Sequence, residues 1–582
     1  MLTDSRTERE TTTRPRGGWP TAIALSLILV GLAGTSLLVP EPQSLIGDEH
    51  YYYHNGQGIL SGNPSAIGEH DVNLRNIMPL GALYPLTSRL IRDGFGAPRL
   101  AGFSPSANAI FYAKSCTIVL FLGLALLVYV FARELYGAAA GVLAMTLTVF
   151  DPNLLAHSRV VHQDMMGAFF ITAAVYCFWR FLSRPAWPTG AWSIATFAAA
   201  QIARFTSLFL APVFLLLVVG RFGPGLIRSL RRFGLTAVVG PLRRFAGWGI
   251  AYVLVSLTVI NLGYSSDRTG TRLADLDLHS QALAGVQAHA GPFRTLPIPL
   301  PLSYVRGLDL VRLKQETGFG SGPSYLLGKI GETDGKRHGF VTYFLVAFLF
   351  KVPLASQILL VAAVVDLLRR RGWHGFWRDE AFLLVPSSVY FVVFSLSTCQ
   401  LGLRYILMVF PLLWVFAGRV VQRWTERSKG FRLAVVALVA YLVVSNLSYF
   451  PHYIPYFNEL LTDRRMAYTI LADSNLNWGQ SGFYLTRYIE EHPEAMLAPS
   501  WRVLRRHPEV RLPWDPLWDP TRPIPGIVII GASDLVGVTD DPERYRWLRE
   551  TLSPRDHVAY SYLVFEIRPE DIPKSLTRPH DP

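Results

Sequence analysis

The stretch WPTAIALSLILVGLAGTSLLV (Trp19–Val39) carries no charged residue and is followed shortly by GDEHYYY (Gly47–Tyr53). As an α-helix, the first stretch is about long enough to cross a hydrocarbon core of roughly 30 Å. The adjacent carboxylates Asp48 and Glu49 then lie where a membrane span reaches the surface. A carboxylate at that position can accept a proton from a hydroxyl group or bind a metal ion. The alternative is a solvated loop charge.

The composition is that of a membrane protein. Of the 582 residues, 51% are hydrophobic and 17% are charged, whereas soluble domains carry roughly 25% charged residues. The three cysteines form no CxxC pair, which argues against a zinc site or a disulfide framework. Basic residues of a membrane protein report topology, so the net charge of +13 does not indicate nucleic-acid binding.

Hydropathy predicts about eleven membrane-spanning helices in an all-α polytopic protein. Their expected ranges are 19–39, 111–132, 138–156, 164–182, 190–203, 205–220, 245–262, 341–365, 380–398, 402–421 and 432–450. A single tilted helix over 190–220 would reverse the topology downstream. We therefore predict two short helices that meet near Arg204.

Four basic clusters set the orientation. They lie at residues 6–16, in a short loop over 221–244, at 369–378 and at 419–432. The positive-inside rule places all four in the cytoplasm, with a cytoplasmic N-terminus and an outer C-terminus. The protein is expected to lie in the cytoplasmic membrane of a bacterium.

This topology predicts the domain organisation. Residues 1–18 form a disordered cytoplasmic N-terminus and 19–450 form the membrane domain. Outer loops cover 40–110, with an amphipathic stretch near Leu74–Ile91, and 263–340, with short helices. Apolar runs at 527–530 and 558–567, flanked by helical patterns at 483–491 and 542–551, predict a small extracytoplasmic α/β domain over 451–567. A disordered tail is expected at 568–582.

A second acidic candidate lies on the same outer face. The stretch from His157 to Asp164 joins two predicted spans, and it contains His162. Asp164 directly precedes an apolar run, so it could serve only to face a helix dipole. Two acidic sites that converge from separate loops nevertheless favour an active site.

Three cations interrupt apolar runs toward the outer leaflet: Lys114, Arg204 and Arg404. A cation inside the membrane costs several kcal/mol unless it is paired or hydrated. A lipid phosphate would suit all three, because arginine binds phosphate bidentately and lysine binds it as a point charge. The alternative is snorkelling to the interface.

Several motifs resemble those of a known family. They are Asp48-Glu49, Ser158-Arg159 leading to Asp164, Arg204-Phe205-Thr206, GLRYIL (Gly402–Leu407), HGFVTYFLVAFLFKVPL (His338–Leu354), YFNEL (Tyr456–Leu460) and DSNLNWGQ (Asp473–Gln480). In this order the motifs are similar to those of the GT-C glycosyltransferases. Among these enzymes, they most resemble the bacterial protein-mannosyltransferase-like group, which uses polyprenyl-phosphate sugars. Asn477 stands where the last signature usually has aspartate, and Arg204 stands where relatives often have lysine.

The resemblance implies an inverting glycosyltransferase that moves a sugar from a polyprenyl-phosphate carrier to an acceptor hydroxyl on the outer face. Asp48 is the expected base, with Glu49 and Asp164 positioning substrates, and Arg404, Arg204 and Lys114 holding the lipid phosphate. The tail motif adds Asp473, Asn475, Trp478 and Gln480 as further candidates, with packing of the outer domain as the alternative role. No cofactor is expected to be required, although a divalent metal could be shared by the carboxylates.

The expected partners are the lipid-linked sugar donor, membrane lipids, and an acceptor glycan, lipid or exported protein. The sequence does not separate a protein acceptor from a lipid or polysaccharide. A flippase for lipid-linked sugars, without chemistry, is the alternative from another class. It should place polar groups near the bilayer midplane and show repeated halves, and neither feature is visible.

Overall fold

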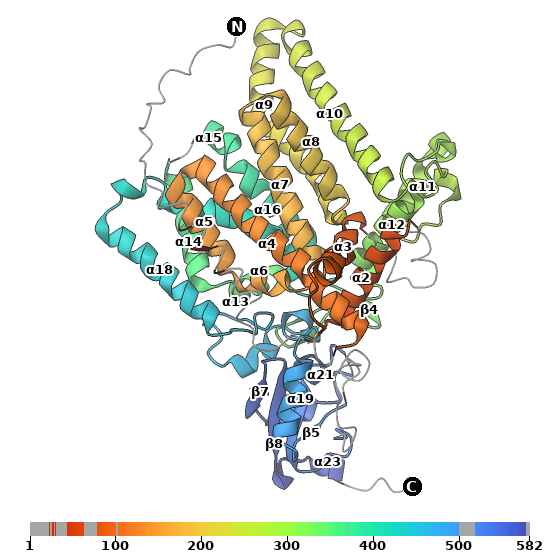
Figure 1. Ribbon diagram of the computed structural model, residues 1–582, viewed down its shortest axis with the longest axis vertical. Helices are drawn as coiled ribbons and strands as arrows, with labels where there is room; N and C mark the ends of the chain where they lie inside the picture. Colours follow the sequence, from red (N-terminus) through yellow and green to blue (C-terminus); the bar gives the residue numbers. More distant parts are fainter. Residues whose placement is uncertain are drawn as a thin grey trace.

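The computed structural model describes residues 44–62, 78–99, 103–370, 372–499, 518–539 and 541–577, together with single positions between 23 and 30. Within these ranges a helical body carries a smaller α/β unit at one end (Figure 1). The predicted N-terminus 1–18 lies outside the described residues. So does nearly all of the first predicted span, 19–39.

Five helical segments in the described part of the chain are long and apolar enough to cross a membrane. They are α4 (Pro105–Tyr136), α7 (Gln163–Ser183), Phe205–Phe233, which combines η5 (Phe205–Phe209) with α9 (Leu210–Phe233), α10 (Thr236–Gly263) and α18 (Lys429–Leu447). Two further pairs qualify only as bent spans: α5 (Ala138–Val149) with α6 (Pro152–Ser158), bent by 62°, and α13 (Tyr343–Lys351) with α14 (Leu354–Arg370), bent by 114°. Length and composition thus support five to seven crossings, and this is a multi-pass membrane protein.

The prediction of about eleven spans therefore finds support only in part. Helices occupy each of the predicted ranges after the first, but three of them are short: α8 (Trp187–Gln201), α16 (Ala381–Ser395) and α17 (Val409–Ala417). The predicted range 380–398 is cut because α16 ends at Ser395 and the chain then runs irregularly to η8 (Leu403–Ile406). η9 (Gly418–Val421) replaces the last turn of the range 402–421.

The break near Arg204 is present as predicted, since α8 ends at Gln201 and η5 begins at Phe205. The side chain of Gln201 donates hydrogen bonds to the carbonyls of Phe197 and Ser207, which satisfies backbone groups at the break. The expected short loop over 221–244 is instead a helical hairpin. α9 continues to Phe233, the chain turns at Gly234 with a φ of +75°, and α10 starts at Thr236.

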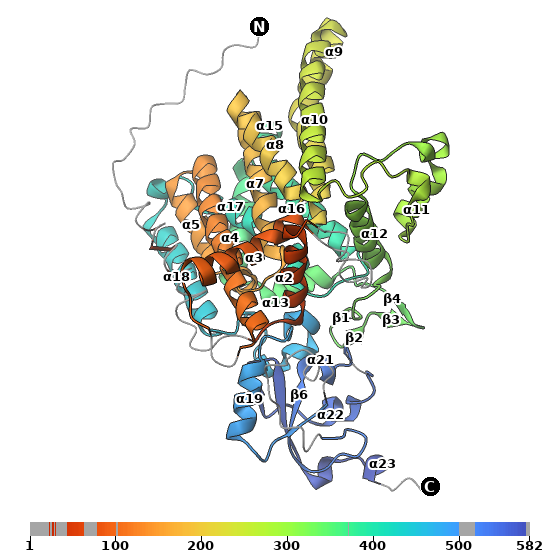
Figure 2. The same ribbon diagram turned by 45° about the vertical axis from the view of Figure 1, so that its right-hand side comes forward.

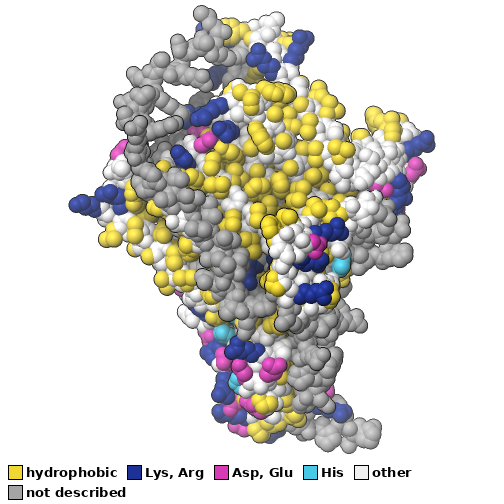
Figure 3. All heavy atoms as spheres, viewed as in Figure 1, with side chains coloured by type: hydrophobic (Ala, Val, Ile, Leu, Met, Phe, Trp, Pro, Cys, Tyr) yellow, Lys and Arg dark blue, Asp and Glu magenta, His cyan; other side chains and the backbone are white. Residues whose placement is uncertain are grey.

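The surface separates by residue type along the long axis. Figure 3 shows hydrophobic side chains over the helical body, Lys and Arg toward its upper end, and mixed charges over the C-terminal unit. The α9–α10 hairpin projects at the end opposite that unit in Figures 1 and 2. An apolar surface between two polar ends is what a membrane-embedded helical body requires.

The predicted outer loops contain ordered elements. The first has α2 (Gly47–Leu60), η3 (Pro79–Ala82) and α3 (Leu83–Arg89). The second has η6 (Leu273–Asp275), α11 (Gln281–His289), η7 (Gly291–Thr295) and α12 (Leu302–Thr317), followed by the hairpins β1 (Tyr325–Leu326) with β2 (Lys329–Ile330) and β3 (Glu332–Thr333) with β4 (Lys336–Arg337). α15 (Trp373–Arg378) connects α14 with α16.

The C-terminal unit is a four-stranded sheet in the order β5-β6-β8-β7. Its strands are β5 (Met496–Leu497), β6 (Gly526–Gly531), β7 (Asp556–Val558) and β8 (Tyr562–Ile567), with β5 parallel to β6 and the other pairs antiparallel. α19 (Gly482–Glu491) packs Leu485 and Ile489 against one face, beside Ile529 and Val564. α21 (Ala532–Leu535) and α22 (Arg546–Thr551) follow β6. Short helices at Pro569–Asp571 (η13) and Lys574–Thr577 (α23) show that ordered structure continues past the expected start of the tail at 568.

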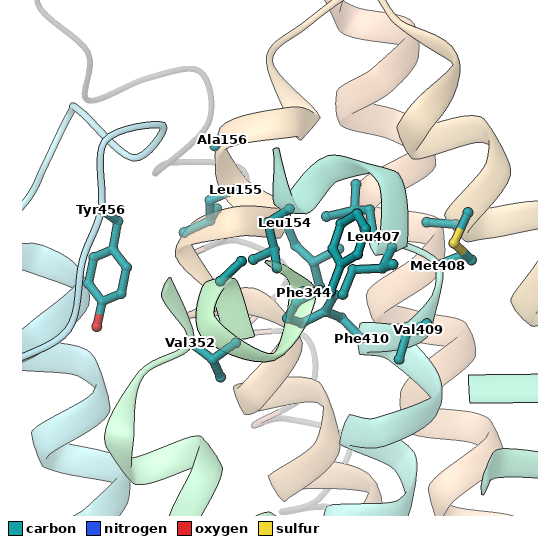
Figure 4. Packing of buried hydrophobic residues seen from close by; sticks show 14 of the residues in the cluster. Leu154, Leu155, Ala156, Phe344, Val352, Leu407, Met408, Val409, Phe410 and Tyr456 are labelled. Carbon is teal, nitrogen blue, oxygen red and sulfur yellow. The ribbon is translucent and has the colours of Figure 1, made fainter. Parts of the chain in front are cut away.

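The buried core joins the two parts. Short helices contribute to it beside the long spans: Leu154 of α6, Phe344 of α13 and Phe410 of α17 pack together (Figure 4). Tyr456, from the segment after α18, lies at the same level. The bends of both pairs are therefore buried in the protein interior, close to the loops that carry the candidate site.

Candidate active site

Five segments far apart in the sequence meet at a cavity of about 280 Å³. Asp48 comes from the first turn of α2, Asp164 from the start of α7, Arg204 from the break after α8, and Arg404 from η8. α12 supplies the fifth wall. The lining comprises Asp48, Tyr51, Tyr52, Asn55, His162, Gln163, Asp164, Arg204, Phe205, Thr206, Val311, Lys314, Gln315, Gly320, Ser321, Phe394, Cys399, Leu401, Arg404 and Tyr405.

Asp164 is the centre of a buried charge cluster. Its carboxylate is 1% exposed and lies 2.5 Å from a guanidinium nitrogen of Arg204 and 4.0 Å from one of Arg404. The Nδ1 atom of His162 lies 2.8 Å from its other oxygen. A buried carboxylate of this kind is tolerable only when it is paired and hydrogen-bonded. Asp164 therefore orients two arginines at the cavity wall and is poorly suited to take up a proton.

Gly167, one turn after Asp164, makes room for this pairing. A Cβ atom at position 167 would lie 2.7 Å from the Cδ atom of Arg204. The side chain of Arg204 thus crosses α7 at the one residue without a side chain, and this route brings its guanidinium to Asp164.

His162 lies between Arg404 and Asp164. Its Nε2 atom lies 3.2 Å from a guanidinium nitrogen of Arg404, which can only donate. The imidazole proton is thereby assigned to Nδ1, which faces Asp164. Burial lowers the pKa of His162, against the opposing effect of Asp164. The ring stacks edge-on with Tyr52, at a centroid distance of 4.3 Å.

Asp48 is the carboxylate of the cavity with access to solvent, because it is half-buried whereas Asp164 and Glu49 are fully buried. The indole N–H of Trp478 donates a hydrogen bond of 3.0 Å to its Oδ2 atom. The guanidinium of Arg404 lies over the same indole, 3.9 Å from the ring centroid. Trp478 thus connects the candidate base with the candidate phosphate ligand.

Glu49 and Lys114 lie outside the cavity lining, contrary to their expected roles in substrate contact. Glu49 is fully buried and accepts hydrogen bonds of 2.8 Å from the backbone N–H groups of Ile46 and Val161. Lys114 lies 3.4 Å from the same carboxylate. These contacts fix the start of α2 to the segment before His162. The Glu49–Lys114 pair therefore holds Asp48 and His162 in place without lining the cavity.

The tail motif forms the junction between the C-terminal unit and the helical body. The side chain of Asn475 donates to the Tyr343 hydroxyl at 2.8 Å and accepts from the backbone N–H of Leu403 at 3.2 Å, next to Arg404. Gln480 donates to Ser561 at 3.0 Å, and the backbone N–H of Asp473 donates to Ser533 at 3.1 Å. These contacts pack the motif between the two parts, and the motif also places Trp478 against Asp48 and Arg404.

Lys351 holds the tail motif in place, a role that the sequence analysis did not predict. At the break between α13 and α14 its ammonium is buried, and it donates hydrogen bonds of 2.8 Å to the carbonyls of Asn475 and Ile454. Its position in the quoted KVPL stretch, inside an apolar run, was the available signal. Lys314 and Gln315 of α12 were also missed, and nothing in the sequence of the predicted outer loop distinguishes them.

Comparisons with known proteins agree with the sequence motifs. Residues 101–228, which carry Asp164 and Arg204, match the family of dolichyl-phosphate-mannose-protein mannosyltransferases (PMT). No curated protein matches the chain in a sequence search.

Solved structures show weak similarity over much of the chain. ArnT from Cupriavidus metallidurans bound to undecaprenyl phosphate is 14% identical, with 97% of this chain and 100% of that chain covered and a TM-score of 0.46. The Archaeoglobus fulgidus oligosaccharyltransferase in the apo form is 12% identical, with 91% and 73% covered and a TM-score of 0.46. The arabinosyltransferase EmbB from Mycobacterium smegmatis is 13% identical, with 76% and 34% covered and a TM-score of 0.38. The motifs and the family match over residues 101–228 are consistent with a membrane protein of the GT-C glycosyltransferase superfamily.

Proposed function

We propose that this protein is an inverting glycosyltransferase that moves a sugar from a polyprenyl-phosphate carrier to an acceptor hydroxyl. The observation that carries the proposal is the composition of one small cavity. It combines a solvent-accessible carboxylate, Asp48, with two guanidinium groups, Arg204 and Arg404, that are held by Asp164. The family matched by residues 101–228 is named for transfer of mannose from dolichyl phosphate, which has the same donor chemistry.

The reaction needs one carboxylate and one anion site. Asp48 accepts the proton of the acceptor hydroxyl, whose oxygen attacks the anomeric carbon of the donor sugar. The bond from that carbon to the phosphate oxygen breaks, and the polyprenyl phosphate leaves with the electron pair. Arg404 and Arg204 stabilise the developing negative charge. A single displacement inverts the anomeric configuration.

The same cavity argues for transfer without a divalent metal. Asp164, the second carboxylate, is already neutralised by Arg204, Arg404 and His162, and a dication would have to approach the two arginines. We expect turnover to be unchanged after dialysis against EDTA, and a loss restored by Mg²⁺ or Mn²⁺ would refute this part of the proposal.

We further propose that the site faces the outer side of a bacterial inner membrane. The support is the α9–α10 hairpin, whose arginines project at the end opposite the C-terminal unit. Single cysteines at Ser229, near the hairpin tip, and at the exposed Asp277, in the 263–340 region, test the orientation. A membrane-impermeant thiol reagent should label position 277 but not 229 in cells with a permeabilised outer envelope. The reverse pattern would exclude the proposed orientation of the site.

A flippase would need no base at the cavity, so Asp48 distinguishes transfer from transport. Surface glycolipids, polysaccharide and exported proteins of a deletion strain should be compared by mass spectrometry with those of strains complemented by wild type or by Asp48→Asn. One class should lose a sugar in the deletion strain and recover it only with wild type. Full recovery with Asp48→Asn would indicate transport instead. The class that changes identifies the acceptor as protein, lipid or polysaccharide.

A further inference from the structure

Residues 265–300, called the lobe below, leave the end of α10 and are built as an ordered unit. Both ends of the lobe are tied together, since the backbone N–H of Gly270 donates to Ile298 and that of Ile298 donates to Thr271, each at 3.0 Å. The side chain of Asn261 on α10 donates to the Pro299 carbonyl at 3.0 Å. In Figures 1 and 2 the lobe turns back beside the C-terminal half of α10.

Two carboxylates of α12 hold the lobe by the start of α11. Asp309, which is 4% exposed, accepts hydrogen bonds from the backbone N–H groups of His279 and Ser280 and from the Ser280 hydroxyl. Glu316 accepts from the N–H groups of Gln281 and Ala282. The N–H groups of Gln281 and Ala282 in the first turn of α11 are therefore satisfied by α12, and these bonds hold the two helices together.

The tip of the lobe is apolar and open. Val286 is 60% exposed, Phe293 67% and Leu296 53%. Figure 3 shows hydrophobic side chains gathered on the upper side of the lobe, which faces the same way as the α9–α10 hairpin. On the visible face, charged side chains lie to the right of this patch and below it. A soluble loop has no reason to gather large apolar side chains on one face.

The surface next to this tip is apolar as well. α10 is a membrane-crossing candidate, and its C-terminal half exposes Ile250, Val253, Leu254 and Leu262 at 60%, 58%, 58% and 73%. Those side chains face lipid in a membrane-embedded body. In Figures 1 and 2, α11 lies beside the C-terminal half of α10. Arg294, next to Phe293 in the chain, has a side chain long enough to reach the phosphate level.

We propose that the lobe is a membrane anchor: Val286, Phe293 and Leu296 enter the lipid interface beside α10. Apolar faces of interfacial helices lie about 5–10 Å into the boundary between headgroups and acyl chains. Because α12 is fixed to the lobe and supplies Val311, Lys314 and Gln315 to the cavity wall, the anchor also sets this wall relative to the bilayer. The proposal rests on the membrane-spanning fold and does not depend on the proposed reaction.

The test uses full-length protein in phospholipid vesicles with an environment-sensitive fluorophore on Phe293→Cys. The matched control is Asp277→Cys, whose native side chain is 82% exposed on the same lobe. The wild-type protein supplies the background from Cys116, Cys177 and Cys399. Lipids that carry a nitroxide near the headgroup should quench most of the fluorescence at position 293 and little at 277.

Two results would overturn the anchor. Equal, weak quenching at both positions would show that the tip stays in water. A fluorophore at position 293 that is shielded from water, but loses this shielding when the protein is diluted with excess lipid, would show that a second copy of the chain covers the tip. Quenching at 293 that is independent of dilution supports the anchor, and Val286→Cys should behave in the same way.

Discussion

Trp478 contacts both functional halves of the candidate site, so replacing it with phenylalanine separates its two interactions. The Trp478→Phe variant loses the N–H group that donates to Asp48 at 3.0 Å. It keeps an aromatic ring beneath the guanidinium of Arg404, which lies 3.9 Å from the indole centroid. The change therefore tests the contact with Asp48 with little effect on the contact with Arg404.

The magnitude follows from the kind of hydrogen bond. A bond to a charged acceptor contributes about 1.5–3 kcal/mol. Each 1.36 kcal/mol changes a rate tenfold, so transfer should slow by about 10- to 150-fold if Asp48 must be held in place for catalysis. Trp478→Ala should cost more, because it also removes the cation–π contact, worth about 0.5–2 kcal/mol.

The assay is release of polyprenyl phosphate from a polyprenyl-phosphate sugar by purified protein in vesicles. Trp518→Phe is the matched control, since Trp518 is also buried and donates its N–H to a backbone carbonyl, that of Ile524, at 3.1 Å. The control should lower stability by about 0.5–1.5 kcal/mol and leave turnover per folded molecule unchanged. Equal turnover of Trp478→Phe and wild type would refute the positioning of Asp48 by Trp478.

Three further changes test other contacts. Arg404→Ala should lower kcat/KM for the lipid-linked donor by about 10- to 150-fold, the worth of a hydrogen bond to a charged group, and an effect on acceptor KM alone would contradict phosphate binding. Gly167→Val should displace Arg204 and reduce transfer at a stability cost of about 1–3 kcal/mol, whereas Gly249→Val on α10, where an added Cβ meets nothing within 4 Å, should do neither. Burial lowers the pKa of His452 from 6.5 to about 4. As the pH falls, this imidazole is therefore protonated in the unfolded chain before it is protonated in the folded protein. Stability is then full above about pH 6.5 and falls toward pH 4. His452→Gln should lose less of its unfolding temperature between pH 7.5 and 5 than wild type, and an equal loss would show that His452 does not titrate as proposed.

The convergence of the site could be predicted because charge is rare in apolar sequence. Asp164, Arg204 and Arg404 each interrupt or border a hydrophobic run, and all three line the cavity with Asp48. Such residues must be paired, and the pairing draws separate segments together. Lys114 obeys the same rule, but its partner is Glu49 outside the cavity. The rule identifies buried cations without identifying their partners.

Adjacent residues can differ in role for a reason that sequence order hides. Asp48 and Glu49 are neighbours in the first turn of α2, and successive side chains of an α-helix point about 100° apart. Asp48 consequently faces the cavity while Glu49 is buried against Ile46 and Val161. The rotation of α2 about its own axis decides which carboxylate faces the cavity, and the quoted stretch carries no information on that rotation.

The number of spans was hard to predict because hydropathy records composition and not direction. The apolar range 341–365 is one continuous signal, yet α13 and α14 meet there at 114°. Lys351 lies at that bend and pairs with the carbonyls of Asn475 and Ile454, contacts more than a hundred residues away. Long-range partners of this kind decide where a helix breaks.

Asp48→Asn tests the central claim most directly, because it preserves the shape of the side chain and removes its ability to accept a proton. Release of polyprenyl phosphate and formation of the glycosylated acceptor should be measured together, with Asp93→Asn, an exposed carboxylate, as the control. General bases contribute about 10²–10⁴-fold, so transfer by Asp48→Asn should fall by at least about 10²-fold while thermal stability and the control stay at wild-type level. Turnover of the folded Asp48→Asn variant within about tenfold of wild type would contradict the account.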